Sequence, residues 1–346
     1  MYRWTPLASQ ASRLLCRNYA AAATIKPDIK LLKQLRQETE VSMTKAKEAL
    51  VKNGNDYQKA LEWLEQDAQV AGAKKAQKVA GRTAGEGLIS IASVSAGGIQ
   101  SKSTIIELNC ETDFVSRNDV FKNLASRIAA TSLLLHDPST AAVEEIPIES
   151  LLHSPLMPHP DQPTDDIDVA SGKTVNEIIV ETIGKLGENI TLRRAAIAVA
   201  NGATAGYAHG GDATTGKIGG LAALQPLKVS NLNESQVTAL TKTARQVARQ
   251  AVGFKPIFLN KEEIPTEELN AQSDKKQYIS ESVLNEQSYL LNPDITIAEH
   301  VSKAAQDAGI SEGATVSGFV RWEVGEGIEK KENDFASEVQ KAAQGN

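Results

Sequence analysis

The sequence predicts an α+β protein: a three-helix module, a core of two related α+β subdomains with antiparallel sheets, and a C-terminal helical tail. Three observations support this fold class. Apolar residues recur at helical spacing between residues 28 and 68. Short β-branched and apolar runs with Gly-containing turns follow, and a helical pattern comes after each group of them. A chain of 346 residues is too long for one ordinary domain, so several modules are expected.

The first segment, residues 1–27, differs in composition from the rest. It is rich in Ser, Ala and Leu, and its four basic residues all precede the first acidic residue, Asp28. This composition is typical of a mitochondrial transit peptide, although an ordinary disordered terminus remains the alternative. Residues 17–20 (RNYA) resemble a matrix-protease cleavage site. We therefore expect a mature chain that begins near Ala20 and resides in the mitochondrial matrix.

Residues 28–68 are predicted to form three short helices. The residues of their apolar faces are Ile29, Leu32 and Leu35, then Met43, Ala46 and Leu50, and then Tyr57, Leu61 and Leu64. The pattern resembles a three-helix module of the ubiquitin-associated type. Residues 69–87 are rich in Ala, Lys and Gly, which indicates a linker or a short basic helix. No aromatic residues alternate with its basic residues, so a nucleic-acid site is not expected there.

Residues 88–185 are predicted to form the first core subdomain. Residues 88–94 and 104–108 read as paired strands, and a helix is expected over residues 119–135. The stretch 137–171 is rich in Pro and acidic residues, and this composition is typical of a surface loop or a disordered insertion.

Residues 186–312 are predicted to form the second core subdomain. Strands are expected over residues 194–200, 205–209 and 217–224, followed by a helix over residues 234–252. The last segment, residues 313–346, should contain a strand over 314–324 and a helical tail over 333–343. The tail has one apolar stripe, made of Phe335, Val339 and Ala342.

Composition limits the classes of partner. The formal net charge is −6 and no strongly basic stretch stands out, so direct binding to nucleic acid is not expected. No run approaches the roughly 18 apolar residues of a membrane span. The two cysteines are Cys16 and Cys110, and Cys16 would leave with the transit peptide. The remaining thiol cannot form an intramolecular disulfide, which suits a reducing compartment.

Residues 211–217 (GDATTGK) match the first seven positions of a phosphate-binding P-loop. The eighth position is Ile218, which has no hydroxyl group for magnesium, and the run leads into an apolar stretch rather than a helix. A hairpin connection is therefore favoured, and it gives Lys217 no role in function. The alternative is that the chain is an NTPase that uses this loop.

The sequence offers no constellation of catalytic residues. The five histidines are scattered and show no metal-ligand spacing near Cys110, which also lacks an orienting His or Asn. We therefore predict that Cys110 is a small buried apolar residue. The chain is not expected to be an enzyme or to bind a cofactor or a metal.

Residues 109–115 (NCETDFV) place an acid and a large aromatic side by side where a strand should end. Asp113 could be a helix cap, and Phe114 could pack in the core or be held out as a wedge. The residues alone favour the cap and the core.

Four motifs together resemble those of the elongation factor Ts family, in order and in approximate spacing. They are residues 36–50 (RQETEVSMTKAKEAL), 109–115 (NCETDFV), 185–194 (KLGENITLRR) and 318–330 (GFVRWEVGEGIEK). The resemblance covers about residues 28 to 343. It implies a protein that exchanges guanine nucleotide on the GTPase elongation factor Tu.

The resemblance also implies which residues contact that partner. Asp113 and Phe114, within the run Thr112–Val115, would reach the magnesium site of the GTP-binding domain. Arg36 and Met43 would meet a helix of the same domain, and His209 would lie near the partner. The residues taken as partner-binding are thus Arg36, Met43, Thr112, Asp113, Phe114, Val115 and His209.

The predicted function is therefore exchange of GDP on mitochondrial elongation factor Tu, in a heterodimer that GTP dissociates. The protein itself would hold no cofactor. An adaptor that binds other proteins through its three-helix module is the alternative from a different class.

Overall fold

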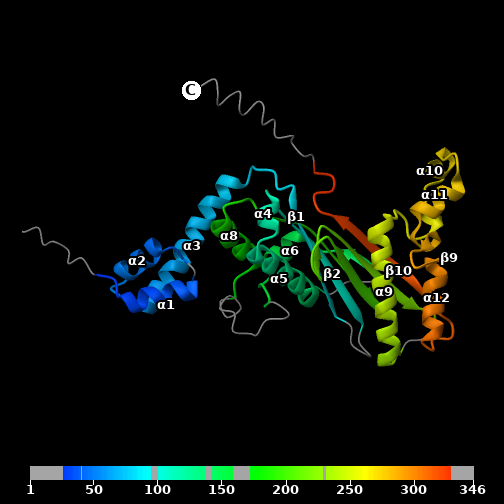
Figure 1. Cartoon of the computed structure of the whole chain (residues 1–346), viewed down its shortest axis with the longest axis horizontal. Helices are drawn as coiled ribbons and strands as arrows, with labels where there is room; N and C mark the ends of the chain where they lie inside the picture. The colour runs from blue at the N-terminus through cyan, green and yellow to red at the C-terminus, as the bar shows by residue number, and fades with distance from the viewer. Residues whose placement is uncertain are drawn as a thin grey trace, which may run out of the picture. The chain divides into compact units, whose positions relative to one another are not determined.

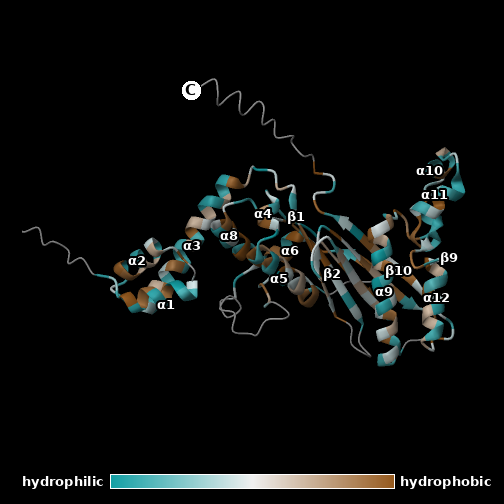
Figure 2. Cartoon of the chain, in the orientation of Figure 1, coloured by the Kyte–Doolittle hydropathy of each residue, from teal (hydrophilic) through white to brown (hydrophobic). Residues whose placement is uncertain are grey.

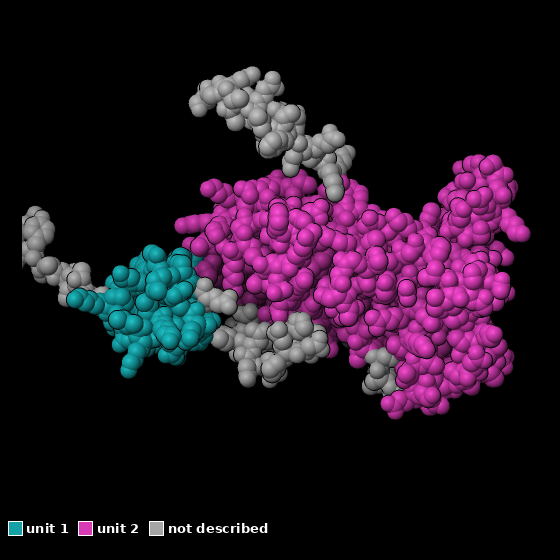
Figure 3. Space-filling view, viewed as in Figure 1, with its two compact units in different colours: residues 1–67 teal, residues 68–346 magenta. Residues whose placement is uncertain are grey.

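A computed structural model describes residues 26–39, 41–94, 100–136, 142–158, 172–228 and 231–328. The chain divides into two compact units, residues 1–67 and residues 68–346 (Figure 3). The predicted transit peptide and the predicted tail helix over 333–343 lie mainly or wholly outside the described residues.

The first unit contains three helices, as predicted. They are α1 (Ile29–Thr39), α2 (Met43–Lys52) and the start of α3 (Tyr57–Val79). Their apolar faces meet in one small core, made of Leu35, Ala46, Ala49, Leu50, Ala60 and Leu64. The side chain of Ser42 caps α2 by accepting a hydrogen bond from the backbone N–H of Lys45 at 3.3 Å.

The helix α3 extends beyond the predicted module, so the expected linker over 69–87 begins as a continuation of that helix. Its Gly72 lies against α8 (Val175–Leu186): a Cβ atom at this position would be 2.8 Å from the carbonyl oxygen of Val180. Gly184 of α8 faces Gly72 at similarly short range. Small residues on both helices therefore permit their close packing.

The second unit contains two main antiparallel sheets. The larger has the strand order β3-β4-β2-β1-β6, with bounds β1 Glu86–Val94, β2 Ser101–Cys110, β3 Val143–Glu145, β4 Thr191–Ala200 and β6 Thr215–Gly216. The smaller has the order β10-β7-β5, with bounds β5 Ala203–His209, β7 Ile218–Pro226 and β10 Ala314–Glu323.

Helices cover the outer faces of the two sheets, which gives this unit four layers (Figure 1). The helices α5 (Asp119–Leu135) and α8 pack on the larger sheet, and α9 (Glu234–Phe254) and α12 (Ile297–Asp307) pack on the smaller one. The apolar side chains of these helices form one core with each sheet.

Alternation along the strands places successive side chains in different cores. Leu88 faces α5 and α8, whereas Ile89 faces the smaller sheet. The core between the sheets contains many small residues. A Cβ atom at Gly219 would lie only 2.5 Å from Ile89, and one at Gly206 equally close to Ile91. Glycines opposite isoleucines thus let the two sheets approach each other.

The remaining elements are short. They are α4 (Asp113–Ser116), α6 (Ile148–Leu152), α10 (Thr266–Ala271), α11 (Lys275–Ser282), β8 (Ser288–Tyr289), β9 (Asn292–Thr296) and 3-10 turns over Lys261–Glu263 and Leu284–Glu286. The helices α10 and α11 are mostly hydrophilic (Figure 2), and only Ser282 among their residues is buried.

The α+β class with antiparallel sheets is confirmed, and α5 spans the predicted residues 119–135. The sheets do not follow the predicted subdomain boundaries, however. The strand β4 lies beyond residue 186 but pairs with β2 in the larger sheet. Likewise β10, predicted as part of the terminal segment, pairs with β7. Strand partners depend on burial between distant segments, which local patterns do not encode.

The prediction of a surface loop over 137–171 is wrong for residues 142–158. Here β3 pairs with β4, and α6 follows. Ile146, Leu151 and Leu156 are buried in the core of the larger sheet. These apolar residues outweigh the Pro-rich, acidic composition from which the loop was predicted. The flanking residues 137–141 and 159–171 lie outside the described ranges.

Within those ranges, no helix is long and apolar enough to cross a membrane.

Candidate partner-binding site

The strand β2 ends at Cys110, and the single turn of α4 follows. Thr112 caps this turn, because its Oγ1 atom accepts a hydrogen bond from the backbone N–H of Val115 at 3.4 Å. Phe114 is 80% exposed, so the core interpretation of this residue is wrong. Val115 is instead buried against the core of the larger sheet. A predicted contact residue thus serves as an anchor, and its neighbour projects into solvent.

Asp113 does not cap the turn. Its carboxylate pairs with Arg117 one helical turn later, at 2.8 Å, and its side chain is 42% exposed. The acid beside Phe114 therefore remains accessible to solvent.

A pair of carboxylates ties this turn to the loop after α8, in an arrangement that we call the carboxylate clasp (Glu111, Thr112, Glu188 and Asn189). Glu188 accepts hydrogen bonds from the backbone N–H of Thr112 at 3.0 Å and from its hydroxyl at 2.5 Å. In return, Glu111 accepts one from the backbone N–H of Asn189 at 2.7 Å. Bonds to ionised acceptors are the stronger kind, so the clasp restrains the turn that carries Phe114.

Lys217, between β6 and β7, reaches the same turn. Its ammonium donates to Ser116 Oγ at 3.2 Å, to the carbonyl of Gly87 at 3.0 Å and to Glu86 Oε2 at 3.1 Å. Ser116 is the last residue of α4, and it is buried. The turn is therefore held by the clasp and also by Lys217.

The run 211–217 forms a hairpin connection between β5 and β7, as predicted. A Cβ atom at Gly216 would lie 2.4 Å from the carbonyl oxygen of His209, so the glycine allows a tight hairpin. The short strand β6 within the run pairs with β1. No helix begins in the run, and the ammonium of Lys217 is bound within the protein. The P-loop interpretation, and with it the NTPase alternative, is disfavoured.

Asp212 fixes the shape of this hairpin. Its carboxylate accepts hydrogen bonds from the backbone N–H groups of Thr214 and Thr215 and from the Thr215 hydroxyl. Burial opposes ionisation of this carboxyl, but these bonds outweigh it and lower the pKa of Asp212. The protein's own contacts thus define the shape of the hairpin.

His209 ends β5 at the base of the hairpin and is exposed. Its ring stacks on Tyr207, with ring centroids 6.4 Å apart. The carbonyl of His209 accepts a hydrogen bond from the backbone N–H of Lys217 at 2.8 Å. Through Lys217, the structure brings His209 and α4 into one region.

Arg36 and Met43 lie in the first unit. Arg36 is exposed on α1, next to the buried Leu35. Met43 is the first residue of α2 and is 50% exposed, outside the small core of that unit. Both side chains are therefore accessible within their unit.

The two remaining motifs meet at a buried carboxylate that sequence reasoning missed. Glu107 of β2 is fully buried and bonds to Arg193 at 3.1 Å and to Arg194 at 2.6 Å. The backbone N–H of Gly325 donates to the same carboxylate at 2.8 Å. Arg194 also lies over the ring of Trp322, at 4.5 Å from its centroid. The signal in the sequence was an acid inside an apolar strand together with two adjacent arginines.

Cys110 is a buried free thiol, as predicted. Burial, with a smaller effect of the Glu188 charge, raises the pKa of Cys110 to about 12. The thiol therefore stays protonated and is a poor nucleophile. Over the described part of the chain, no three His, Cys, Asp or Glu side chains are grouped to hold a metal ion.

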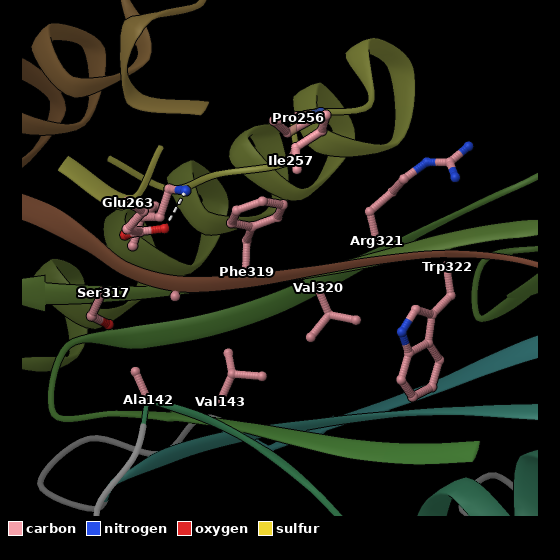
Figure 4. A pocket seen from close by; sticks show the side chains of 12 residues that line it. Ala142, Val143, Pro256, Ile257, Glu263, Ser317, Phe319, Val320, Arg321 and Trp322 are labelled. Carbon is pink, nitrogen blue, oxygen red and sulfur yellow. Dashed lines mark hydrogen bonds between the residues drawn. The ribbon is translucent and has the colours of Figure 1, made fainter. Parts of the chain in front are cut away.

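A pocket of about 570 Å³ lies along β10, away from α4 (Figure 4). Phe319 and Trp322 project from opposite sides of that strand, and the loop at Ile257 covers Phe319. Its two charged groups already have partners. Glu263 accepts from the backbone N–H of Leu259 at 3.0 Å, and Arg321 pairs with glutamates beyond it. This pocket shows no free acid and base pair for catalysis.

Comparison with known proteins gives consistent similarities. A family model described as "Elongation factor TS" matches residues 111–277. A protein of Coprinopsis cinerea named "Elongation factor Ts, mitochondrial" is 36% identical over 91% of this chain and 96% of its own length. A protein of Laccaria bicolor with the same name is 35% identical, over 90% and 95% of the two chains. "Elongation factor Ts" of Brucella anthropi is 34% identical, over 91% and 98%.

Proposed function

Because the chain belongs to the elongation factor Ts family, we propose that it is a guanine-nucleotide exchange factor for elongation factor Tu in mitochondrial translation elongation. It would bind Tu·GDP, release GDP and be displaced when GTP binds. In this role it assists another protein's nucleotide exchange and catalyses no chemical reaction.

The observation that carries this proposal is the exposure of Phe114. A large aromatic side chain that is 80% exposed lacks the free energy of burial, yet hydrogen bonds from the clasp and Lys217 restrain its turn. Such an arrangement suits a residue that becomes buried in a partner. The acid beside it, Asp113, is accessible from the same turn.

The proposed mechanism follows from how a GTPase holds its nucleotide, through Mg²⁺ and a nest of backbone N–H groups. Insertion of Phe114 beside that site would displace the elements that flank it, and Asp113 would disturb the ligands of the ion. Whatever weakens nucleotide binding is weakened by nucleotide in return, so GTP would displace the factor.

Phe114 cannot supply the whole effect. Burial of one Phe is worth roughly 1.5–3 kcal/mol, and each tenfold loss of nucleotide affinity requires about 1.4 kcal/mol. Insertion of Phe114 would therefore account for a tenfold to hundredfold loss of nucleotide affinity, at about 1.4 kcal/mol for each tenfold step. We propose that Arg36, Met43 and His209 contribute further contacts, while Thr112 and Val115 hold the turn.

Two relatives carry the word mitochondrial in their names, which supports a mitochondrial location. We propose the matrix as the compartment, mitochondrial elongation factor Tu as the partner and a heterodimer as the complex. The segment 1–27 would be the transit peptide.

The test is the release rate of a fluorescent GDP from mitochondrial elongation factor Tu, measured with and without the chain from Ala20 onward. Acceleration by this chain is the expected result. Unchanged release, with circular dichroism showing a folded protein, would contradict the proposed function.

A further inference from the structure

Lys217 belongs to a run that resembles a P-loop, but its position in the fold suggests a different role. It lies between β6 of the larger sheet and β7 of the smaller one, and its backbone N–H donates to the carbonyl of His209 at 2.8 Å, while its carbonyl accepts from the N–H of Val324 at 2.9 Å. The backbone of Lys217 is therefore held by the last residue of β5 and by the residue that follows β10.

The ammonium of Lys217 reaches the start of β1 in the larger sheet and also α4. It bonds to the carbonyl of Gly87 and the carboxylate of Glu86 at the start of β1, and to the hydroxyl of Ser116. Ser116 in turn donates from its hydroxyl to the carbonyl of Asp113 at 3.0 Å. A chain of hydrogen bonds thus connects the base of the His209 hairpin to the residue preceding Phe114.

Hydrogen bonds around Glu107 also join the two sheets, but the Lys217 connection ends on α4 itself. A hydrogen bond from an ammonium is among the stronger kinds. Lys217 keeps 39% of its side chain exposed. Its aliphatic stem is therefore not a major part of the core, and its ammonium is the group that acts on α4.

We propose that Lys217 is a positioning residue for nucleotide exchange, which fixes α4 so that Phe114 enters the partner in the productive orientation. This inference rests on the proposed function, since it assigns a role within the same exchange reaction. Lys217 acts through Ser116 and α4 and does not itself touch the nucleotide.

The test is a double-mutant cycle in the fluorescent GDP release assay, with the chain from Ala20 onward at increasing concentration. Lys217→Met keeps the stem and removes the ammonium. We expect it to lower the maximal release rate about tenfold, with less than about a twofold change in the half-saturating concentration. Lys217→Arg, which can still donate to Ser116, should recover most of the rate. Lys242→Met, on the exposed side of α9, is the matched control and should resemble the parent.

The cycle is completed in a Phe114→Ala background. If Lys217 acts through Phe114, then Lys217→Met should have no further effect there, within about twofold. An equal loss in both backgrounds would mean that Lys217 acts independently of Phe114, and it would overturn the proposal. A parent-like rate for folded Lys217→Met would also overturn it.

A second variant covers the case in which Lys217→Met does not fold. Ser116→Ala removes the hydroxyl that accepts from Lys217 and donates to the carbonyl of Asp113, and we expect the maximal rate to fall about threefold because the other two bonds of Lys217 remain. No loss in this variant would count against the proposal. If the parent chain itself fails to accelerate release, the proposed function fails. If the parent accelerates release and the folded variants accelerate it equally, only this inference fails.

Discussion

Two aromatic residues from the family-like motifs have opposite environments. Phe114 is 80% exposed, whereas Trp322 is 9% exposed and lies under Arg194 beside the buried Glu107. Both regions are dense in hydrogen bonds from charged groups. Around Trp322 these bonds join β2, β4 and β10, while around Phe114 they restrain a turn whose aromatic side chain has no core to fill. A family-like motif can therefore pack its aromatic side chain within the fold or leave it exposed to solvent, and burial distinguishes the two.

The largest effect is expected on stability, at the buried Glu107 beside Trp322. Glu107→Gln removes the charge that compensates Arg193 and Arg194, so we expect a loss of about 3–5 kcal/mol in the free energy of unfolding. Chemical denaturation followed by circular dichroism measures it. Glu262→Gln, at an exposed position, is the control and should change stability by less than about 0.5 kcal/mol. A stable Glu107→Gln protein would show that the cluster does not hold the sheets together.

Phe114→Ala should give the reverse result. Its exposed ring contributes little to the folded state, so stability should change by less than about 0.5 kcal/mol. GDP release should fall about tenfold to a hundredfold if the ring is buried in the partner. Leu134→Ala removes an apolar side chain that is 62% exposed elsewhere and should leave release unaltered. Normal release by Phe114→Ala would rule out the wedge.

Glu188→Gln tests whether the clasp is needed to hold the turn that carries Phe114. The amide keeps one acceptor oxygen but loses the charge that receives both hydrogen bonds of Thr112. We expect a loss of about 1 kcal/mol in stability and a severalfold slower GDP release, because the turn is less restrained. A loss of stability without slower GDP release from the folded variant would show that Glu188, like Glu107, serves only the fold.

The smallest effect concerns Cys110, only four residues before Phe114. Burial raises its pKa to about 12, so the thiol should resist maleimide at pH 8 in the native chain from Ala20 onward and react after unfolding. Because the neutral thiol is favoured in the folded state, its contribution to stability is present below the unfolded pKa of about 8.5. That contribution should be lost as the pH rises toward 12. Rapid labelling of the native chain would show that the start of this turn opens.

Much of the fold could be predicted because its signals are local. The periodicity of apolar residues gave α5 at residues 119–135, and the strand runs on either side of residues 95–99 pair as expected. Four motifs suggested the candidate site, and their resemblance predicted an exposed Phe114 where the residues alone favoured the core. Local patterns also misled: the Pro-rich stretch after α5 contains β3 and α6.

The sequence by itself determined the three helices of the first unit, α5, α9, the long strands of the two sheets and the family, since each depends on neighbouring residues or on motifs in order. Only the tertiary structure decided the partners of β4 and β10, the burial of Val115 beside the exposed Phe114, and the contact of Lys217 with Ser116. These features join residues that are many positions apart in the chain. Their free energy comes from desolvating apolar surface and from pairing charges in space, and neither has a signature within one stretch of sequence.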